Sequence, residues 1–478
     1  MLLFISMAQR SIARDGYHIH LKIPNVKDST VYLVNYYGKP LPTIYKRDSA
    51  RFDKNGVASF NSNDSEFVGG IYMMLLSDRN TYFEFLLNKG DDMTITADLK
   101  NLPEGITFKN SPENERFQQY VTFLKGYGTQ QQDLQKELSQ AKTKDDTLAV
   151  HKKAAASSKE LTNYRHSYSE KYPKTLLTTI FNALEVPQVP EGPHLLEDGV
   201  TRDSNFAYNY YKAHFWDGFN FQDDRLIHTP LYDSKLEEYM NKLVFPWPDS
   251  VEKESDRLLK KTRGTKELFK YTLFWVTRNV ENSKVMGMDE AFVYLVENYY
   301  MKGDAYWLSN EELTKYTDRA MKIAPNVIGN LTPEIKLPNV VTKNEESLQN
   351  LKAKYTLLVF YSPNCGHCQK ELPELDSLYR AELKSKGVKM FTVATEGDQK
   401  AINDFITKNK LEEWTNTWDP EHAGDWRGKY DVYSTPTIYL LNEKKIIKGK
   451  RLDHSNIAGL LDMIEKIAKD KSDKKTKS

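Results

Sequence analysis

The residue types that could do chemistry are concentrated in one short motif. The chain has two cysteines in 478 residues, Cys365 and Cys368, with Gly366 and His367 between them. The thiolate form of cysteine is the nucleophile in thiol–disulfide exchange. We therefore expect Cys365 to attack a disulfide and form a mixed disulfide, and Cys368 to resolve it. His367 can supply a positive charge or a hydrogen bond to the Cys365 thiolate.

Other chemistries also use a Cys-x-x-Cys motif, and the sequence argues against each of them. A c-type haem needs a histidine directly after the second cysteine, where this chain has Gln369. A structural zinc site needs four ligands, but there is no second cysteine pair, and His422 and His454 are isolated. A purely structural disulfide across so short a loop would add little stability. We therefore predict redox chemistry with no metal and no other cofactor.

The motif lies where a predicted buried strand meets a predicted helix. Residues 355–361 form a continuous apolar run, and a helical stretch follows from Gly366 to about Leu383. Free N–H groups and the positive end of the helix dipole stabilise a thiolate at a helix start. The remaining pattern predicts an α/β layer arrangement, with strands at 388–394, 437–441 and 445–450 and helices at 401–410 and 457–468.

Two segments of this region resemble a known family. The sequence YSPNCGHCQKELP at 361–373 is similar to the active-site segment of thioredoxin-fold proteins of the TlpA/ResA type, and STPTIYL at 434–440 is similar to their cis-proline strand. The resemblance implies that the bond before Pro436 is cis and that Pro436 lies opposite the cysteines. It also implies that the backbone of Thr435 pairs with an extended substrate.

The family has an acidic residue three positions after the second cysteine, and Glu371 matches it. The resemblance implies that this carboxylate takes and returns the proton of Cys368 during resolution. An ordinary helix-surface residue is the alternative. Thioredoxin has a buried aspartate six residues before its first cysteine, whereas this chain has Val359, so Glu371 is the one carboxylate candidate. Asn364 stands where many relatives have tryptophan, which removes an aromatic lid.

Upstream of this region we expect two further parts. Residues 16–108 contain short strands separated by turn signals, which predicts an antiparallel β-sandwich-like domain. A Ser-Pro-Glu helix start at 111–113 opens a helical region over 109–325. The order of these parts before a TlpA-like domain at 326–470 resembles multidomain envelope thioredoxin-family proteins of Gram-negative bacteria. The predicted fold class is therefore multidomain α+β with a C-terminal α/β thioredoxin-like fold.

Two other groups of residues invite a functional interpretation, but a structural one is favoured for each. His18 and His20 lie on one face of a predicted strand, where solvent-facing histidines are more common than a metal pair. The aromatic segment AHFWDGFNF at 213–221 is interpreted as core or interdomain packing rather than a binding site.

Composition limits the class of protein and its partners. Lysine and arginine number 67 against 66 acidic residues, which gives a net charge of +1 and argues against a nucleic-acid partner. No stretch approaches the roughly eighteen unbroken apolar residues of a membrane span. Residues 1–15 include an apolar run that resembles the back half of a secretory signal, although a short apolar N-terminus is the alternative. Residues 471–478 are predicted to be a disordered basic tail.

Together these features predict a thiol–disulfide oxidoreductase that acts on protein thiols or disulfides in the periplasm or cell envelope of a Gram-negative bacterium. We expect it to receive electrons from an upstream thiol–disulfide donor. The alternative is a redox-sensing binding or scaffold protein whose upstream domains hold a partner. A peroxidase of the peroxiredoxin kind is disfavoured because the P-x-x-x-T-x-x-C segment is absent.

Overall fold

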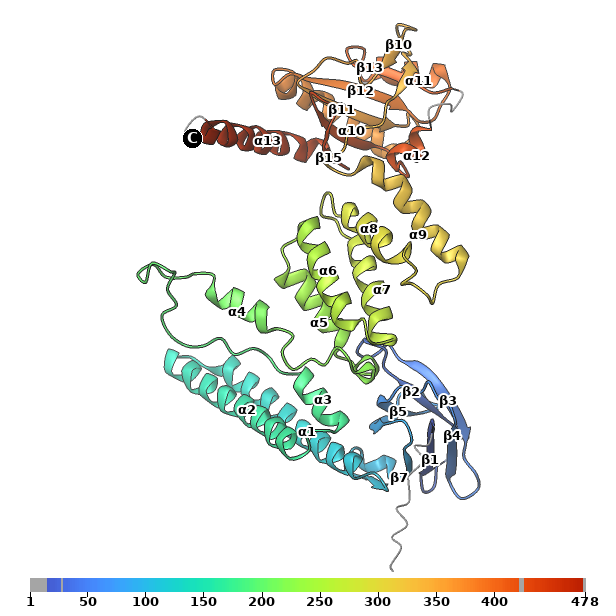
Figure 1. Ribbon diagram of the computed structural model, residues 1–478, viewed down its shortest axis with the longest axis vertical. Coiled ribbons are helices and arrows are strands. Elements are labelled where there is room, and N and C mark those ends of the chain that lie inside the picture. Colours follow the sequence, from blue (N-terminus) through green and yellow to red (C-terminus); the bar gives the residue numbers. More distant parts are fainter. Residues whose placement is uncertain (1–14, 27–28, 421–424, 476–478) are drawn as a thin grey trace, which may run out of the picture. The chain divides into compact units, whose positions relative to one another are not determined.

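The computed structural model describes residues 15–26, 29–420 and 425–475 (Figure 1). They form two compact units, of which unit 1 runs to Val244 and also includes Arg257–Thr272, and unit 2 comprises Phe245–Asp256 and the chain from Leu273 onward. The helical part expected over 109–325 is therefore not a separate compact unit. It is divided because α6 (Pro248–Thr262) and α7 (Glu267–Glu281) each have residues in both units. The predicted signal segment lies outside the described residues, apart from Asp15.

Unit 1 begins with two four-stranded sheets that share one core, which confirms the predicted β-sandwich. Their strand orders are β4-β1-β7-β8 and β3-β2-β5-β6. The strands are β1 (Tyr17–Lys22), β2 (Thr30–Asn35), β3 (Tyr45–Arg51), β4 (Val57–Ser62), β5 (Gly70–Leu76), β6 (Tyr82–Leu87), β7 (Asp92–Ala97) and β8 (Ile106–Lys109). One pairing is not antiparallel, because β1 and β7 run parallel. A parallel neighbour needs a long crossover connection, so no local turn signal reveals it.

The sandwich leaves the two strand histidines at its surface. His18 Nδ1 lies 3.0 Å from Asn61 Oδ1, and His20 Nδ1 lies 3.0 Å from Ser59 Oγ on the neighbouring strand β4. No group of three or more His, Cys, Asp or Glu residues that could hold a metal ion occurs in the described part of the chain. The favoured interpretation of these histidines as solvent-facing strand residues is consistent with both observations.

The helical part of unit 1 starts with a hairpin of α1 (Pro112–Gln140) and α2 (Lys144–Lys171), and α1 begins at the predicted helix start. Thr143 and Asp146 form a capping box at the start of α2, which satisfies free N–H groups there. The further helices are α3 (Leu176–Ala183), α4 (Phe206–His214), η2 (Asp224–His228), α5 (Tyr232–Glu238) and the π-helix η3 (Tyr239–Leu243). The aromatic segment packs in the interior of this unit, with buried side chains at Phe215, Trp216, Phe219 and Phe221.

Unit 2 ends in a five-stranded mixed sheet of order β13-β12-β11-β14-β15. The strands are β11 (Tyr355–Tyr361), β12 (Val388–Ala394), β13 (Thr415–Trp418), β14 (Thr437–Asn442) and β15 (Ile447–Lys450). β11, β12 and β13 run parallel, β14 runs antiparallel to β11, and β15 runs antiparallel to β14. All seven residues of β11 are buried because it is the central strand, which explains its unbroken apolar sequence.

Helices cover both faces of this sheet (Figure 1). Side chains of α10 (Gly366–Leu378), α11 (Gln399–Lys408) and α13 (His454–Lys475) pack in the core on one face. Side chains of α12 (Trp426–Tyr430) pack on the other face, together with apolar residues near the hairpin of β9 (Lys336–Pro338) and β10 (Glu345–Ser347). The layers confirm the predicted thioredoxin-like α/β arrangement.

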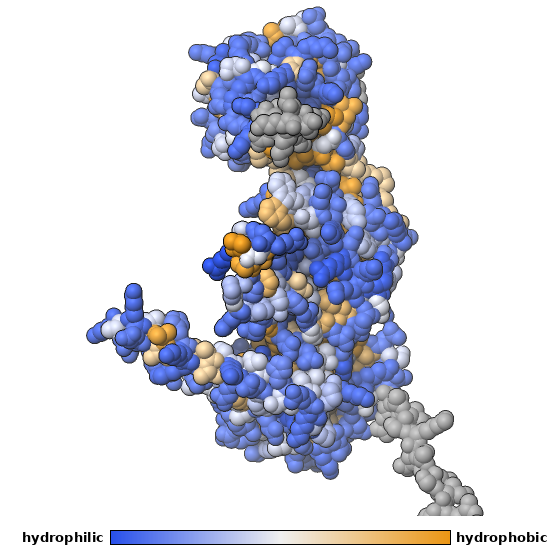
Figure 2. All heavy atoms as spheres, turned by 60° about the vertical axis from the view of Figure 1, so that its left-hand side comes forward, coloured by the Kyte–Doolittle hydropathy of each residue, from blue (hydrophilic) through white to orange (hydrophobic). Residues whose placement is uncertain are grey.

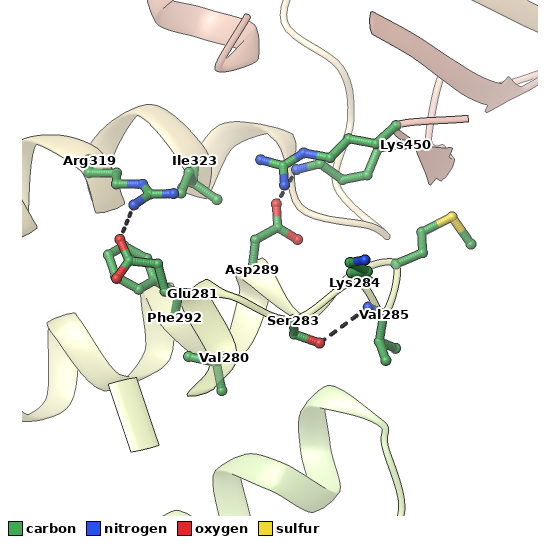
Figure 3. Close-up of a pocket in the computed structure, with 13 residues that line it drawn as sticks. Val280, Glu281, Ser283, Lys284, Val285, Asp289, Phe292, Arg319, Ile323 and Lys450 are labelled. Atoms are coloured by element: carbon green, nitrogen blue, oxygen red, sulfur yellow. Dashed lines mark hydrogen bonds and ion pairs between the residues drawn. The ribbon is translucent and has the colours of Figure 1, made fainter. Parts of the chain in front are cut away.

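The same unit includes α8 (Asp289–Leu295), the π-helix η4 (Val296–Tyr300) and α9 (Asn310–Ile323). A buried ion pair ties α8 to the end of β15, because the ammonium group of Lys450 contacts the carboxylate of Asp289 (Figure 3). Lys450 Nζ also donates to the backbone oxygen and Oδ1 of Asn326 at 2.9 and 2.7 Å. A cavity of about 280 Å³ lies beside this pair.

The C-terminal helix is longer than predicted. α13 runs to Lys475, so residues 471–475 are helical rather than part of a disordered tail. The reason is that Ile457 and Leu461 anchor its first turns in the core, after which each added residue extends an existing helix at little cost. Among the described helices, none is long and apolar enough to cross a membrane.

Candidate active site

Cys365 is the N-cap residue of α10, directly after the turn that follows β11. Its thiol donates to the backbone oxygen of Thr435, with an Sγ–O distance of 3.1 Å. The peptide bond between Thr435 and Pro436 is cis, as the resemblance implied. The structure therefore brings Cys365 together with Thr435 and Pro436, although Thr435 lies 70 residues after Cys365 in the sequence.

The surroundings of Cys365 favour its thiolate. Partial burial alone would raise the pKa of the thiol, but hydrogen bonds from the side chain of Thr435 and from the backbone and side chain of Cys368 lower it. The backbone N–H of His367 adds a further hydrogen bond in the same direction. The net effect is a pKa below the usual value for cysteine. These N–H groups are the free donors of the first turn of α10, so the helix start activates the sulfur.

Cys368 has the opposite environment. It is fully buried in the core beneath α10. Its pKa is raised to about 12, mainly by burial and in part by the neighbouring Cys365, although the backbone of Ser362 and the side chain of Thr435 act in the opposite direction. Both cysteines are free thiols. One sulfur is thus half-buried and activated, whereas the other is enclosed and protonated.

The turn that presents Cys365 is held by neighbouring loops. Ser362 Oγ donates to Glu396 Oε2 at 3.2 Å, and the amide of Gln369 donates to the backbone oxygen of Pro363 at 3.1 Å. Gly397 packs so closely that a Cβ there would lie 2.9 Å from Cγ of Pro363, and its φ of +97° suits glycine alone. These contacts fix the turn that precedes Cys365 against the loop that follows β12.

Glu371 does not face either cysteine. Its side chain is largely buried, and both carboxylate oxygens are occupied by one residue at the start of α13. The backbone N–H of His454 donates to Glu371 Oε1 at 2.5 Å, and His454 Nδ1 lies 2.8 Å from Oε2. The hydrogen bond with Glu371 is the main cause that raises the pKa of His454. His454 looks isolated in the sequence because it lies 83 positions after Glu371, too far for a local pattern to relate the two residues.

The imidazole of His367 lies at the surface, as does the side chain of Asn364. His367 reaches the nucleophile through its backbone N–H. A role for its ring stays a prediction. Tyr433, two residues before Thr435, is 71% exposed although it is aromatic, and no feature of its sequence neighbourhood singled it out.

This arrangement defines a class of protein before any comparison. The first cysteine is half-buried and activated at a helix start, and the second is buried one turn later. A cis-proline lies beside them on a mixed five-stranded sheet. These are the parts of a thioredoxin-like dithiol centre.

The comparisons with known proteins agree with this class. Residues 328–450 match the model of the AhpC/TSA family, and residues 17–117 and 131–326 match two domains of unknown function, DUF4369 and DUF5106. Sporulation thiol-disulfide oxidoreductase A of Bacillus subtilis is 33% identical over 123 residues, which are 25% of this chain and 72% of that protein. Thiol-disulfide oxidoreductase ResA of Oceanobacillus iheyensis is 28% identical over 131 residues, 26% of this chain and 65% of that protein. The chain belongs to the thiol-disulfide oxidoreductases with a thioredoxin-like fold.

Solved structures are similar to parts of the chain. The thioredoxin domain of a thiol-disulfide oxidoreductase from Bacteroides vulgatus is 27% identical and matches 30% of this chain and 97% of its own, with a TM-score of 0.27. A thioredoxin-like protein from Bacteroides caccae is 21% identical and matches 58% of this chain and 97% of its own, with a TM-score of 0.44.

Proposed function

We propose that this protein exchanges disulfides with protein substrates through Cys365 and Cys368. In the reducing direction the Cys365 thiolate attacks a substrate disulfide, so one substrate sulfur leaves and a mixed disulfide forms. Cys368 then attacks Cys365 Sγ, the second substrate sulfur leaves as a thiol, and the protein holds the Cys365–Cys368 disulfide. An upstream thiol–disulfide donor would reduce that disulfide again.

The observation that carries this proposal is the contrast between the two sulfurs. The pKa of Cys365 is lowered and its side chain is half-buried, whereas burial raises the pKa of Cys368 to about 12. A substrate therefore meets the reactive sulfur first. The second sulfur reacts only after the mixed disulfide has brought a target within its reach.

The cis-proline loop beside Cys365 offers a backbone edge for an extended protein segment. We propose that the backbone of Thr435, held by the cis bond to Pro436, pairs with the substrate. The exposed ring of Tyr433 supports a protein substrate, because aromatic side chains supply much of the contact energy in protein interfaces.

We also propose that Glu371 handles the proton of Cys368 and that His454 connects it to solvent. Glu371 lies one helical turn after Cys368, and His454 is partly exposed. In this proposal the Glu371 carboxylate turns from His454 to the sulfur during resolution and then returns.

The proposed location is the cell envelope of a Gram-negative bacterium. The support is the apolar run before Gln9 and the resemblance of the domain order to envelope proteins. Fractionation of cells that express the tagged protein would test the location.

Trapping tests the exchange function. Cys368→Ser should accumulate mixed disulfides with client proteins, because Cys365 attacks but nothing releases the client. Cys365→Ser should trap nothing and lose activity. Insulin reduction with a thiol donor separates an oxidoreductase from the alternative, a redox sensor or scaffold. An oxidoreductase reduces many insulin molecules per protein molecule, whereas a sensor changes its own state once.

A further inference from the structure

Tyr361 carries a buried hydroxyl group that has no function in the account so far. It is the last residue of β11 and is 1% exposed. Its hydroxyl oxygen is buried and has no hydrogen-bond partner among the described residues. Buried polar groups are almost always bonded, because an unbonded one loses its water without compensation. An unbonded buried hydroxyl beside a reactive centre therefore calls for an explanation.

The strand alternation directs this hydroxyl towards the second cysteine. Val359 and Tyr361 pack in the core on the α10 face of the sheet, whereas Leu358 and Phe360 pack on the opposite face. Cys368 is part of the same α10-side core. Burial is the main cause that raises the pKa of Tyr361, and the charge of a Cys368 thiolate raises it further. The phenol and the sulfur therefore lie in the same core, and the hydroxyl makes no hydrogen bond to the sulfur while that sulfur is a thiol.

Few groups in this core can stabilise a charge on Cys368. The backbone of Ser362 and the side chain of Thr435 are the groups that lower its pKa, and they leave it at about 12. Val359 replaces the buried aspartate of thioredoxin, and the carboxylate of Glu371 is bonded to His454. Two further acidic residues, Glu374 and Asp453, raise the pKa of His454.

We infer that the hydroxyl of Tyr361 donates a hydrogen bond to the Cys368 thiolate while that sulfur attacks the mixed disulfide. The inference rests on the proposed exchange function and adds one residue to its second step. Tyr361 keeps its own proton, because burial holds its pKa far above the working pH. The Sγ–Sγ bond of Cys365 and Cys368 forms, the bond from Cys365 to the substrate breaks, and the proton lost by Cys368 ends on the released substrate thiol. The unbonded hydroxyl is thus a donor held ready for the thiolate.

An aromatic disulfide with a coloured thiol product, dithiobis(nitrobenzoate), separates the two steps. The reduced protein releases one nitrothiophenolate when Cys365 attacks and a second when Cys368 resolves the adduct. We expect Tyr361→Phe to leave the first phase unchanged and to slow the second about ten-fold or more, since it removes one hydrogen bond to a charged group. We also expect its melting temperature to equal or exceed that of the wild type, because the variant removes an unbonded buried hydroxyl.

A matched control is Tyr379→Phe. Tyr379 is a buried tyrosine of the same core, and it begins the π-helix η6 (Tyr379–Leu383) that directly follows α10. This variant should leave both phases unchanged. The inference would be overturned if the folded Tyr361→Phe variant released the second nitrothiophenolate at the wild-type rate. Equal slowing of both phases, or a fall in melting temperature, would also overturn it, because a structural role produces those results. Failure of the exchange function looks different, since the wild-type protein would then show no second phase.

Discussion

At the scale of single residues, the two cysteines have the same side chain and opposite environments. The motif itself predicted which sulfur attacks, because a helix start stabilises a thiolate. The structure adds that Thr435 bonds the nucleophile and that burial keeps Cys368 protonated. Contacts such as Glu371 with His454 could not be predicted, because they join segments that no local pattern relates.

Substitutions at His367 separate the contributions of its backbone and its ring. The backbone N–H favours the Cys365 thiolate, and the ring is exposed. Proline lacks that N–H, so His367→Pro should raise the pKa of Cys365 and lower the reduction potential by about 30 mV, which corresponds to about 1.4 kcal/mol for two electrons. His367→Ala keeps the N–H and should lower it less. Equilibration with glutathione measures both potentials. An equal or higher potential in His367→Pro would contradict this electrostatic account.

The pair of His454 and Glu371 predicts a pH-dependent contribution to stability. The hydrogen bond with Glu371 raises the pKa of His454 in the folded protein. A raised folded pKa contributes stability that is complete below the unfolded pKa of about 6.5 and is lost as the pH rises through the folded pKa. We expect His454→Ala to lower the melting temperature at about pH 5 and to have a smaller effect at about pH 9.

NMR titration gives the matching direct measurement. The pKa of His454 should lie above that of an unpaired histidine in the wild type and fall towards it in Glu371→Gln. Glu374 and Asp453 keep part of the increase. Identical titration curves in the two proteins would show that the contact in the structure does not act on the imidazole.

At the scale of elements, the predicted strands agree with the observed ones where a strand is buried, because burial gives the sequence a long apolar run. β11 and β12 follow the predicted bounds because they are buried strands with long apolar runs. β13 was not predicted, since Thr-Asn-Thr-Trp is short, polar and without alternation. β3 likewise carries no strand pattern of its own, because none of its residues is buried. Edge strands gain their pairing from the neighbouring strand rather than from their own pattern.

The ion pair between α8 and β15 leads to a prediction at this scale. The side chain of Lys450 is 3% exposed, so Asp289→Ala leaves a buried ammonium group whose remaining hydrogen-bond partner, Asn326, is neutral. We expect a loss of about 3 kcal/mol in the free energy of unfolding. The double variant Asp289→Ala/Lys450→Met should recover most of it, because the charge is gone. Urea denaturation measures the three proteins.

An exposed ion pair in the same unit is the control. Glu311 and Lys315 form a pair on the surface of α9, and both side chains are at least 70% exposed. Glu311→Ala should change the stability by less than about 0.5 kcal/mol. A similar loss in Asp289→Ala and Glu311→Ala would show that burial does not strengthen the dependence on Asp289.

At the scale of the whole molecule, the dithiol centre is built within the C-terminal part of unit 2. Its cysteines, the cis-proline loop and the Glu371–His454 contact lie between residues 361 and 454. The surface of the protein is mostly hydrophilic on the face seen in Figure 2, with small scattered apolar areas. The described groups that act on the two sulfurs all lie between Ser362 and Thr435, so we expect exchange of small disulfides to proceed without the upstream domains.

A truncation series tests this independence. A fragment from Ser283 to Ser478 keeps both Asp289 and Asn326, which bond Lys450. We expect this fragment to fold and to reduce a small aromatic disulfide at a rate within about two-fold of that of the full chain. The reason is that the removed residues lie outside the dithiol centre, and distant parts of a protein contribute independently. A fragment from Val327 loses Asn326 and should melt at a lower temperature. Loss of most activity in the well-folded longer fragment would show that upstream domains complete the site.

The central claim is that Cys365 attacks and Cys368 resolves. The most direct measurement is the rate of alkylation of each cysteine in the reduced full-length protein at neutral pH, followed by mass spectrometry of the separate peptides. Cys365 has a lowered pKa and is partly exposed, whereas Cys368 is buried and its pKa is raised. We therefore expect Cys365 to be labelled at least ten-fold faster, because the thiolate fraction at neutral pH falls about ten-fold for each unit by which the pKa rises. Labelling of Cys368 at the same rate as Cys365, or faster, would contradict the account.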